Sequence, residues 1–147
     1  MSTTDSPKSH RLAVPSVPDR VSEVDEFVEA VLHGAGVAEE TIADIAIAVT
    51  EVVNNAINHG NSRDPQKTVT LTVICEADRV QIDVADQGPG FDPRRVADPL
   101  AQENLLREVG RGIFIVRHLM DTVEFDSAPG AGTTVRLTKM LGTSSVP

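Results

Sequence analysis

The sequence predicts an α+β fold in which helices cover one face of a mostly antiparallel sheet. Two early segments repeat apolar residues every three or four positions, as amphipathic helices do. Over residues 68–84 the apolar period changes to two, which indicates strands. Short turns join the middle strands and the last strands, and such turns pair neighbouring strands antiparallel. One sheet layer against one helix layer is the simplest fold with this order.

The size of the chain fits one domain. It has 147 residues, which is typical of a single hydrophobic core. Residues 10–141 form the expected domain, because residues 1–9 and 142–147 are rich in Ser, Thr and Pro and resemble flexible tails. Aromatic residues make up only 3% of the chain, so we expect an aliphatic core.

Charge and composition exclude several classes of protein. The net charge is −9, which argues against a nucleic-acid partner and against docking on an anionic membrane. A single cysteine rules out a disulfide framework. No apolar stretch approaches the roughly 20 residues of a membrane span, and the N-terminus lacks an apolar signal segment. We therefore expect a soluble cytoplasmic protein.

The first elements are a strand and two helices. Residues 11–14 form a short strand closed by Pro15 and Pro18. Asp19 is the expected N-cap of a helix over 20–33, and Gly34 or Gly36 ends it. Its apolar stripe consists of Val21, Val24, Phe27, Val28, Val31 and Leu32. The second helix spans 39–59 and ends at Gly60, with apolar residues Ile42, Ile45, Ala46, Val49, Val53, Ala56 and Ile57.

The remaining elements are strands and one helix. Residues 76–78 join two strands in a hairpin, and Cys75 falls on the apolar face as a core residue. Residues 87–109 are rich in Gly, Pro and charge, and we expect them to be irregular. A helix over 112–120 and strands over 122–126 and 133–139 complete the domain.

The second helix carries an unusual polar face. Glu51, Asn55 and Asn58 lie opposite the apolar stripe, and Glu51 and Asn55 are four residues apart, one above the other. An ordinary solvated face is the alternative. However, Asn disfavours helix interiors, and a solvated face more often uses Glu, Lys and Gln. A carboxylate beside a carboxamide suits an oxygen-ligated hard cation with a proton acceptor next to it.

Three pairs of glycines indicate close backbone approaches. Gly88 and Gly90 follow a strand, Gly110 and Gly112 open the expected third helix, and a last pair at 130 and 132 joins the final strands as a hairpin turn. At the helix start, free N–H groups and the positive end of the dipole favour a phosphate. The chain has neither a Walker A loop nor a Rossmann fingerprint.

Asp86 ends a strand just before the first glycine pair. It is either an ordinary turn residue or a carboxylate that accepts a hydrogen bond from a ligand N–H. Four scattered histidines, His10, His33, His59 and His118, lack the spacing of metal ligands, so we expect them to be structural.

Together these segments resemble the Bergerat-fold ATP-binding domain of the GHKL superfamily, over about residues 10–140. The segment 51–61, EVVNNAINHGN, resembles the N box; 86–91, DQGPGF, resembles the G1 box; 110–116, GRGIFIV, resembles the G2 box; and 132–137, GTTVRL, resembles the terminal Gly-Thr strand. The short chain and the HLMDTVEF segment resemble bacterial anti-sigma-factor serine/threonine-protein kinases. The implied fold is a two-layer α/β sandwich of the histidine-kinase-like ATPase type.

The resemblance implies a role for each matching residue. Glu51 would be the catalytic base, Asn55 would ligate Mg²⁺, and Asp86 would bind the adenine amino group of ATP. The other residues implied to bind the nucleotide are Asn54, Asn58, Gly88, Gly90, Arg107, Gly110, Arg111, Gly112, Ile113 and Thr133. Residues 92–109 would form the ATP lid.

The implied function is an anti-sigma factor that binds a sigma factor and phosphorylates an anti-anti-sigma (STAS-domain) partner. Some relatives carry an arginine just before the G2 glycines, whereas Glu108 and Val109 stand there in this chain, so Arg107 or Arg111 would take its place. A non-catalytic ATP/ADP-binding module and a detached two-component kinase domain are the alternatives. Glu51 favours the enzyme over the module. Such relatives often form homodimers through the first strand and helix.

Overall fold

The sheet has five strands in the order β1-β2-β3-β5-β4, and every neighbouring pair is antiparallel. The computed structural model describes residues 8–90 and 103–142, except for the side chains of 103–110. The strands are β1 (Lys8–Pro15), β2 (Thr68–Cys75), β3 (Arg79–Ala85), β4 (Thr122–Ser127) and β5 (Thr133–Met140). The hairpins β2–β3 and β4–β5 join sequence neighbours, as the short turns predict.

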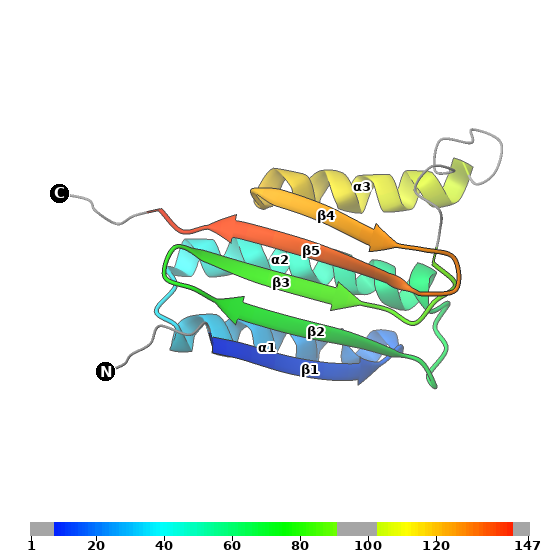
Figure 1. Ribbon diagram of the computed structural model, residues 1–147, viewed down its shortest axis with the longest axis horizontal. Coiled ribbons are helices and arrows are strands. Elements are labelled where there is room, and N and C mark those ends of the chain that lie inside the picture. The colour runs from blue at the N-terminus through cyan, green and yellow to red at the C-terminus, as the bar shows by residue number, and fades with distance from the viewer. Residues whose placement is uncertain (1–7, 91–102, 143–147) are drawn as a thin grey trace.

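The helices lie on one face of this sheet, as Figure 1 shows. They are α1 (Val21–Gly34), α2 (Glu39–Asn55) and α3 (Glu103–Leu119), with short turns η1 (Pro18–Arg20) and η2 (Ala56–Gly60). The α+β prediction is confirmed. Among the described residues, no helix is long and apolar enough to cross a membrane.

The core lies between the sheet and the helices and is aliphatic. Val73, Ile82 and Leu137 are neighbours across three strands in register, and all three are fully buried. From the helices, Val28, Leu32, Ile45, Val49 and Val53 complete the same cluster. Alternation in the strands and the helical stripe thus place the apolar residues where the sequence periods predict.

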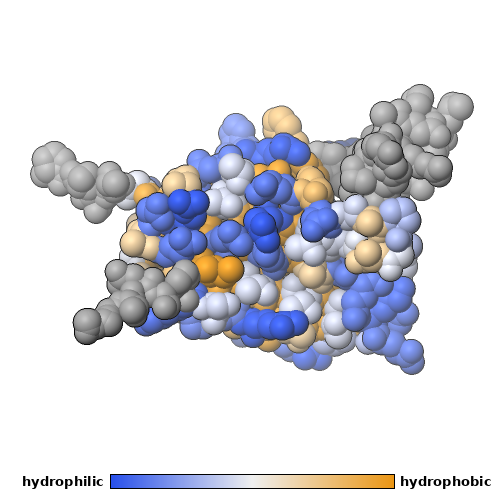
Figure 2. Space-filling view, viewed as in Figure 1, coloured by the Kyte–Doolittle hydropathy of each residue, from blue (hydrophilic) through white to orange (hydrophobic). Residues whose placement is uncertain are grey.

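The other face of the sheet carries no helix and is mostly polar, as Figures 1 and 2 show. There Asp83 on β3 pairs with Arg136 on β5, with Nε–Oδ1 at 3.0 Å. The carboxylate raises the pKa of Arg136 above its usual value, mainly through this hydrogen bond. A polar face of this kind is typical of an antiparallel sheet covered on one side only.

Two boundaries near the N-terminus differ from the prediction. β1 begins at Lys8, because Lys8 and Ser9 continue the pairing with Cys75 and Ile74; residues 1–7 lie outside the described residues. Asp19 is not the N-cap of α1. It lies in η1, and Arg20 occupies the cap position without a side-chain capping bond, since the 3-10 turn leads directly into the helix.

The start of α3 differs most from the prediction. The helix begins at Glu103, so Gly110 and Gly112 lie inside it and not at its N-terminus. Residues 103–109, expected to be irregular and part of a lid, are helical, while 92–102 lie outside the described residues. Leu, Arg and Glu favour helix in this stretch, which offsets about 1 kcal/mol lost at each interior glycine.

Candidate functional site

The first part of the candidate site is the carboxylate of Asp86, at the end of β3. Its Oδ1 accepts backbone hydrogen bonds from Gly88 N at 3.0 Å and from Thr133 N at 3.1 Å. The backbone N–H of Asp86 in turn donates to the Thr133 carbonyl at 2.9 Å. Asp86 and Thr133 are 47 positions apart in the sequence, and β3–β5 pairing brings them together. The half-buried carboxylate is thus held in one orientation.

Glycines allow backbone segments to pack closely around this carboxylate. A Cβ on Gly88 would collide with the carbonyl oxygen of Gly60, and a Cβ on Gly90 would collide with that of Ala128. Gly132 has φ +73, and its Cβ would collide with the carbonyl oxygen of Asp86. Three backbone segments therefore approach the end of β3 more closely than side chains would allow.

The second part of the site is the polar face of α2. Glu51 and Asn55 are both half-buried, so they do not form an ordinary solvated face. They point toward Gly112 of α3. A Cβ on Gly112 would lie 3.1 Å from Asn55 Nδ2 and 3.3 Å from Glu51 Oε2. A carboxylate and a carboxamide therefore share one small area between the two helices.

Gly60 connects the two parts. The π turn η2 continues α2 and ends at Gly60, and a Cβ on Gly60 would collide with Oδ2 of Asp86. The helix that carries Glu51 and Asn55 therefore leads directly to the carboxylate of Asp86. π turns of this kind are frequent at functional sites. A single ligand long enough to contact both parts would lie along the end of α2.

Other residues from the sequence prediction lie near these two parts but have different surroundings. Asn58 accepts a hydrogen bond from Arg63 Nε at 2.8 Å, so its carbonyl oxygen holds the following loop. Asn54 and Ile113 are half-buried, and Arg111 is exposed on α3. Arg107 and Gly110 belong to α3, but their side-chain surroundings lie outside the described residues.

The expected helix start at Gly110 and Gly112 is wrong for this structure, whereas the phosphate-binding role of these two glycines stays a prediction. Because α3 begins at Glu103, the N–H groups near Gly110 and Gly112 are in the helix interior, where they bond to carbonyls one turn back. Gly112 instead serves as a point of close packing between α3 and α2.

Sequence reasoning missed two residues of the site, Gly60 and Asn61. Gly60 was expected only to end a helix. Asn61 was not singled out, although its side chain is buried and bonded on three sides. An Asn directly after a helix-ending Gly is an ordinary local pattern, so only the tertiary contacts identify it.

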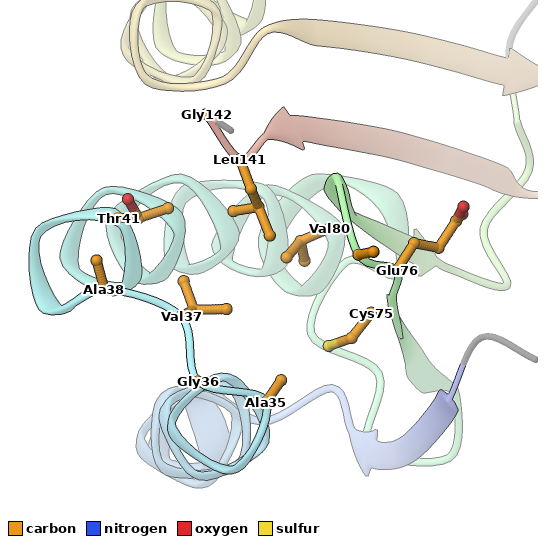
Figure 3. Close-up of a pocket in the computed structure, with 11 residues that line it drawn as sticks. Ala35, Gly36, Val37, Ala38, Thr41, Cys75, Glu76, Val80, Leu141 and Gly142 are labelled. Atoms are coloured by element: carbon orange, nitrogen blue, oxygen red, sulfur yellow. The ribbon is translucent and has the colours of Figure 1, made fainter. Parts of the chain in front are cut away.

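A cavity of about 340 Å³ lies at the opposite end of the sheet, between the α1–α2 loop, the β2–β3 hairpin and the end of β5. Figure 3 shows that its lining is mixed, with Val37, Val80 and Leu141 beside Thr41, Glu76 and the half-buried Cys75. Burial raises the pKa of the Cys75 thiol, which makes it a poor nucleophile. The cavity lacks the convergent polar groups found around Asp86, so we place the candidate site at Asp86 and Glu51.

Among the described residues no group of three or more His, Cys, Asp or Glu side chains could hold a metal ion. Mg²⁺ does not need such a group, because it is commonly held by one or two protein oxygens together with substrate phosphates and waters.

Comparison with known proteins identifies the family to which this chain belongs. Residues 14–139 match the family described as "Histidine kinase-like ATPase domain". The chain is 37% identical over 105 residues to the anti-sigma F factor of Thermoanaerobacter sp. strain X514, covering 70% of this chain and 73% of that protein. It is 36% identical over 107 residues to the anti-sigma F factor of Bacillus subtilis, covering 71% and 73%. Serine-protein kinase RsbW of Oceanobacillus iheyensis is 28% identical over 125 residues, covering 81% and 79%.

Solved structures agree on the fold. The RsbU and RsbW domains of Rv1364c from Mycobacterium tuberculosis superpose with a TM-score of 0.67 at 20% identity, over 90% of this chain and 32% of that one. The histidine kinase domain from Erythrobacter litoralis EL346 gives 0.54 at 22% identity, over 87% and 62%. Together with the match over residues 14–139, these findings show that the chain belongs to the histidine kinase-like ATPase family.

Proposed function

We propose that the protein is a cytoplasmic anti-sigma factor and an ATP-dependent serine/threonine-protein kinase. It binds a sigma factor, and it phosphorylates a STAS-type anti-anti-sigma partner. The observation that carries the proposal is the placement of Glu51 and Asn55 side by side toward Gly112, on a helix that leads to Asp86. The names of the relatives, anti-sigma F factor and serine-protein kinase RsbW, support the same role.

The adenine end of the site rests on Asp86. Both bonds of its Oδ1 go to backbone N–H groups, which fixes the plane of the carboxylate and directs Oδ2 toward Gly60. A fixed acceptor oxygen next to glycine backbone suits the exocyclic amino group of a purine. A base without the amino group would leave this half-buried acceptor unpaired, so the site would discriminate against such a base.

The phosphate end rests on Asn55 and Glu51. Their oxygens are the hard donors that Mg²⁺ prefers, so the donor set fits the metal, with Asn55 as its protein ligand. When bound, Mg²⁺ neutralises charge on the phosphates. Five other residues remain predicted nucleotide contacts: Asn54, Asn58, Arg107, Arg111 and Ile113.

Glu51 has the role of proton acceptor in the transfer. The serine or threonine oxygen of the partner forms a bond to the γ-phosphorus as the bond from that phosphorus to the ADP oxygen breaks. Glu51 takes the hydroxyl proton, and its place one helical turn from Asn55 puts the base next to the metal ligand. No nucleophile from this chain is needed.

The runner-up function is a non-catalytic ATP- or ADP-binding module that captures a partner without phosphorylating it. The packing of Gly112 directly onto Glu51 and Asn55 favours it, since this conformation leaves little room in front of the base. Glu51 itself favours the kinase, because a module that only binds nucleotide has little need for a carboxylate there.

Phosphate transfer tests the two proposals. Labelled γ-phosphate is offered to the wild type and to Glu51→Gln, with anti-anti-sigma proteins from the same organism as acceptors. We expect near-normal MgATP binding and sigma-factor capture by Glu51→Gln, and transfer lowered at least about 100-fold. The matched control is Glu40→Gln, an exposed glutamate of the same helix, which should transfer normally. If the wild type binds nucleotide and phosphorylates none of the acceptors, the module replaces the kinase.

A further inference from the structure

The side chain of Asn61 connects three separate segments from a buried position. It is 1% exposed. Its Nδ2 donates to Ser16 Oγ at 2.8 Å and to the Thr68 carbonyl at 3.0 Å. Its Oδ1 accepts from the backbone N–H of Gln87 at 2.8 Å. Both donor hydrogens and the carbonyl oxygen of the amide are therefore used in hydrogen bonds.

The bond to Gln87 concerns the candidate site directly, because Gln87 is the residue after Asp86. The Gln87 side chain is also held, since its Oε1 accepts from the backbone N–H of Thr68 at 2.7 Å. On the other side of Asn61, Gly60 lies against Gly88 and against Oδ2 of Asp86. The corner formed by Gly60 and Asn61 thus contacts the carboxylate of Asp86 and the two residues that follow it.

The same corner is rigidly joined to α2. The backbone N–H of Asn61 donates to the Ala56 carbonyl at 2.8 Å, which closes the π turn. A π turn holds more residues than an α turn, so it changes the side of the helix that the following residues face. The position of Asn61, and through it that of Asp86, is consequently fixed relative to Glu51 and Asn55 on the same helix.

We propose that Asn61 is a positioning residue that holds Asp86 in place and thereby sets the preference of the site for adenine. This inference rests on the proposed ATP site, and it assigns the selectivity of that site to a residue that does not touch the ligand. Without Asn61, the Gln87 N–H loses a buried acceptor, which is costly unless the segment moves. Movement of that segment displaces the adjacent Asp86.

Nucleotide selectivity separates positioning from general stability. Inosine triphosphate has a carbonyl where ATP has the exocyclic amino group, so the ratio of the two dissociation constants reports on Asp86. Calorimetric titration of Asn61→Ala should show ATP affinity lowered about tenfold and inosine triphosphate affinity changed little, so that the ratio moves toward one. Ser16→Ala is the matched control. It removes a buried partner of Asn61 but leaves the bond to Gln87 intact, and its ratio should equal that of the wild type.

A double variant tests whether Asn61 acts through Asp86. In the Asp86→Asn background, Asn61→Ala should change the ratio no further, because neighbouring residues that act as one unit are not additive. If Asn61→Ala does not fold, Asn61→Ser replaces it, since the serine hydroxyl is one atom shorter than the Asn carbonyl oxygen. We expect this variant to shift the ratio in the same direction.

The outcomes distinguish the inference from the function on which it rests. If Asp86→Asn leaves the ratio unchanged, the adenine assignment is wrong and the role of Asn61 falls with it. If Asp86→Asn changes the ratio but Asn61→Ala lowers both affinities equally, Asn61 is merely structural and the inference alone is overturned. Additive effects in the double variant overturn it as well.

Discussion

A single methyl group on Gly112 tests whether α2 and α3 enclose a working site. In Gly112→Ala the new Cβ would lie 3.1 Å from Asn55 Nδ2 and 3.3 Å from Glu51 Oε2, closer than the usual 3.5 Å or more. These two side chains must therefore move by a few tenths of an ångström. Neither is backbone, so the movement is possible without distortion of the helices.

The energies of this change nearly cancel for folding. Alanine in a helix interior is about 1 kcal/mol more favourable than glycine. Shifted rotamers of the two neighbours cost roughly 0.5–1.5 kcal/mol each. The net change in unfolding free energy is then within about 2 kcal/mol, which for a chain of this size moves Tm by less than about 8 °C. Catalytic geometry is much less tolerant, since a displacement of about 1 Å can cost about 100-fold.

We therefore expect Gly112→Ala to fold normally and to bind MgATP at least about tenfold more weakly, by calorimetry. The added methyl would press on Asn55 and Glu51 and displace the two side chains proposed to hold the metal and to accept the proton. Gly34→Ala is the control, because Gly34 is also helical and nothing lies within 4 Å of its added Cβ. Wild-type MgATP affinity in a folded Gly112→Ala protein would refute the view that a nucleotide occupies this area.

Three further outcomes are expected. Asp86→Asn should lower ATP affinity by about 1–3 kcal/mol, because the amide nitrogen replaces an acceptor oxygen; unchanged affinity in calorimetry contradicts the adenine role. Asn55→Ala should weaken MgATP binding far more than binding of ATP in EDTA, and equal losses would argue against a metal ligand. Burial raises the pKa of the Cys75 thiol. At pH 8 a smaller fraction of this thiol is therefore ionised to thiolate than in a free cysteine. Mass spectrometry should show at least about tenfold slower alkylation by iodoacetamide than in the unfolded chain, and equal rates would contradict its burial.

Most of the fold could be predicted from local pattern. Period-two alternation over β2 and β3 and the apolar stripes of α1 and α2 record which side of each element is buried, and the structure buries those sides. The pairing of Glu51 with Asn55 was also predictable, because residues four apart on a helix always share a face. These features depend only on residues close together in the sequence.

The beginning of α3 could not be predicted in this way. Two glycines in three residues locally indicate a helix start or a loop, and the structure instead continues the helix through both. Gly112 is placed there by contact with α2, and its lack of a side chain allows that contact. The reason why Gly112 lies inside the helix therefore cannot be found in the local sequence.

Local sequence patterns were sufficient to predict most of the secondary structure and the residue types of the site, but the contacts that join them arise only from packing in three dimensions. Thr133 bonds to Asp86 across 47 positions, and Asn61 bonds to Ser16 across 45. Such contacts depend on strand order and on the angle at which helices pack, and the local pattern of residues in a sequence contains neither. Local periods determine which face of an element is buried, but only packing determines which residue of another element meets it.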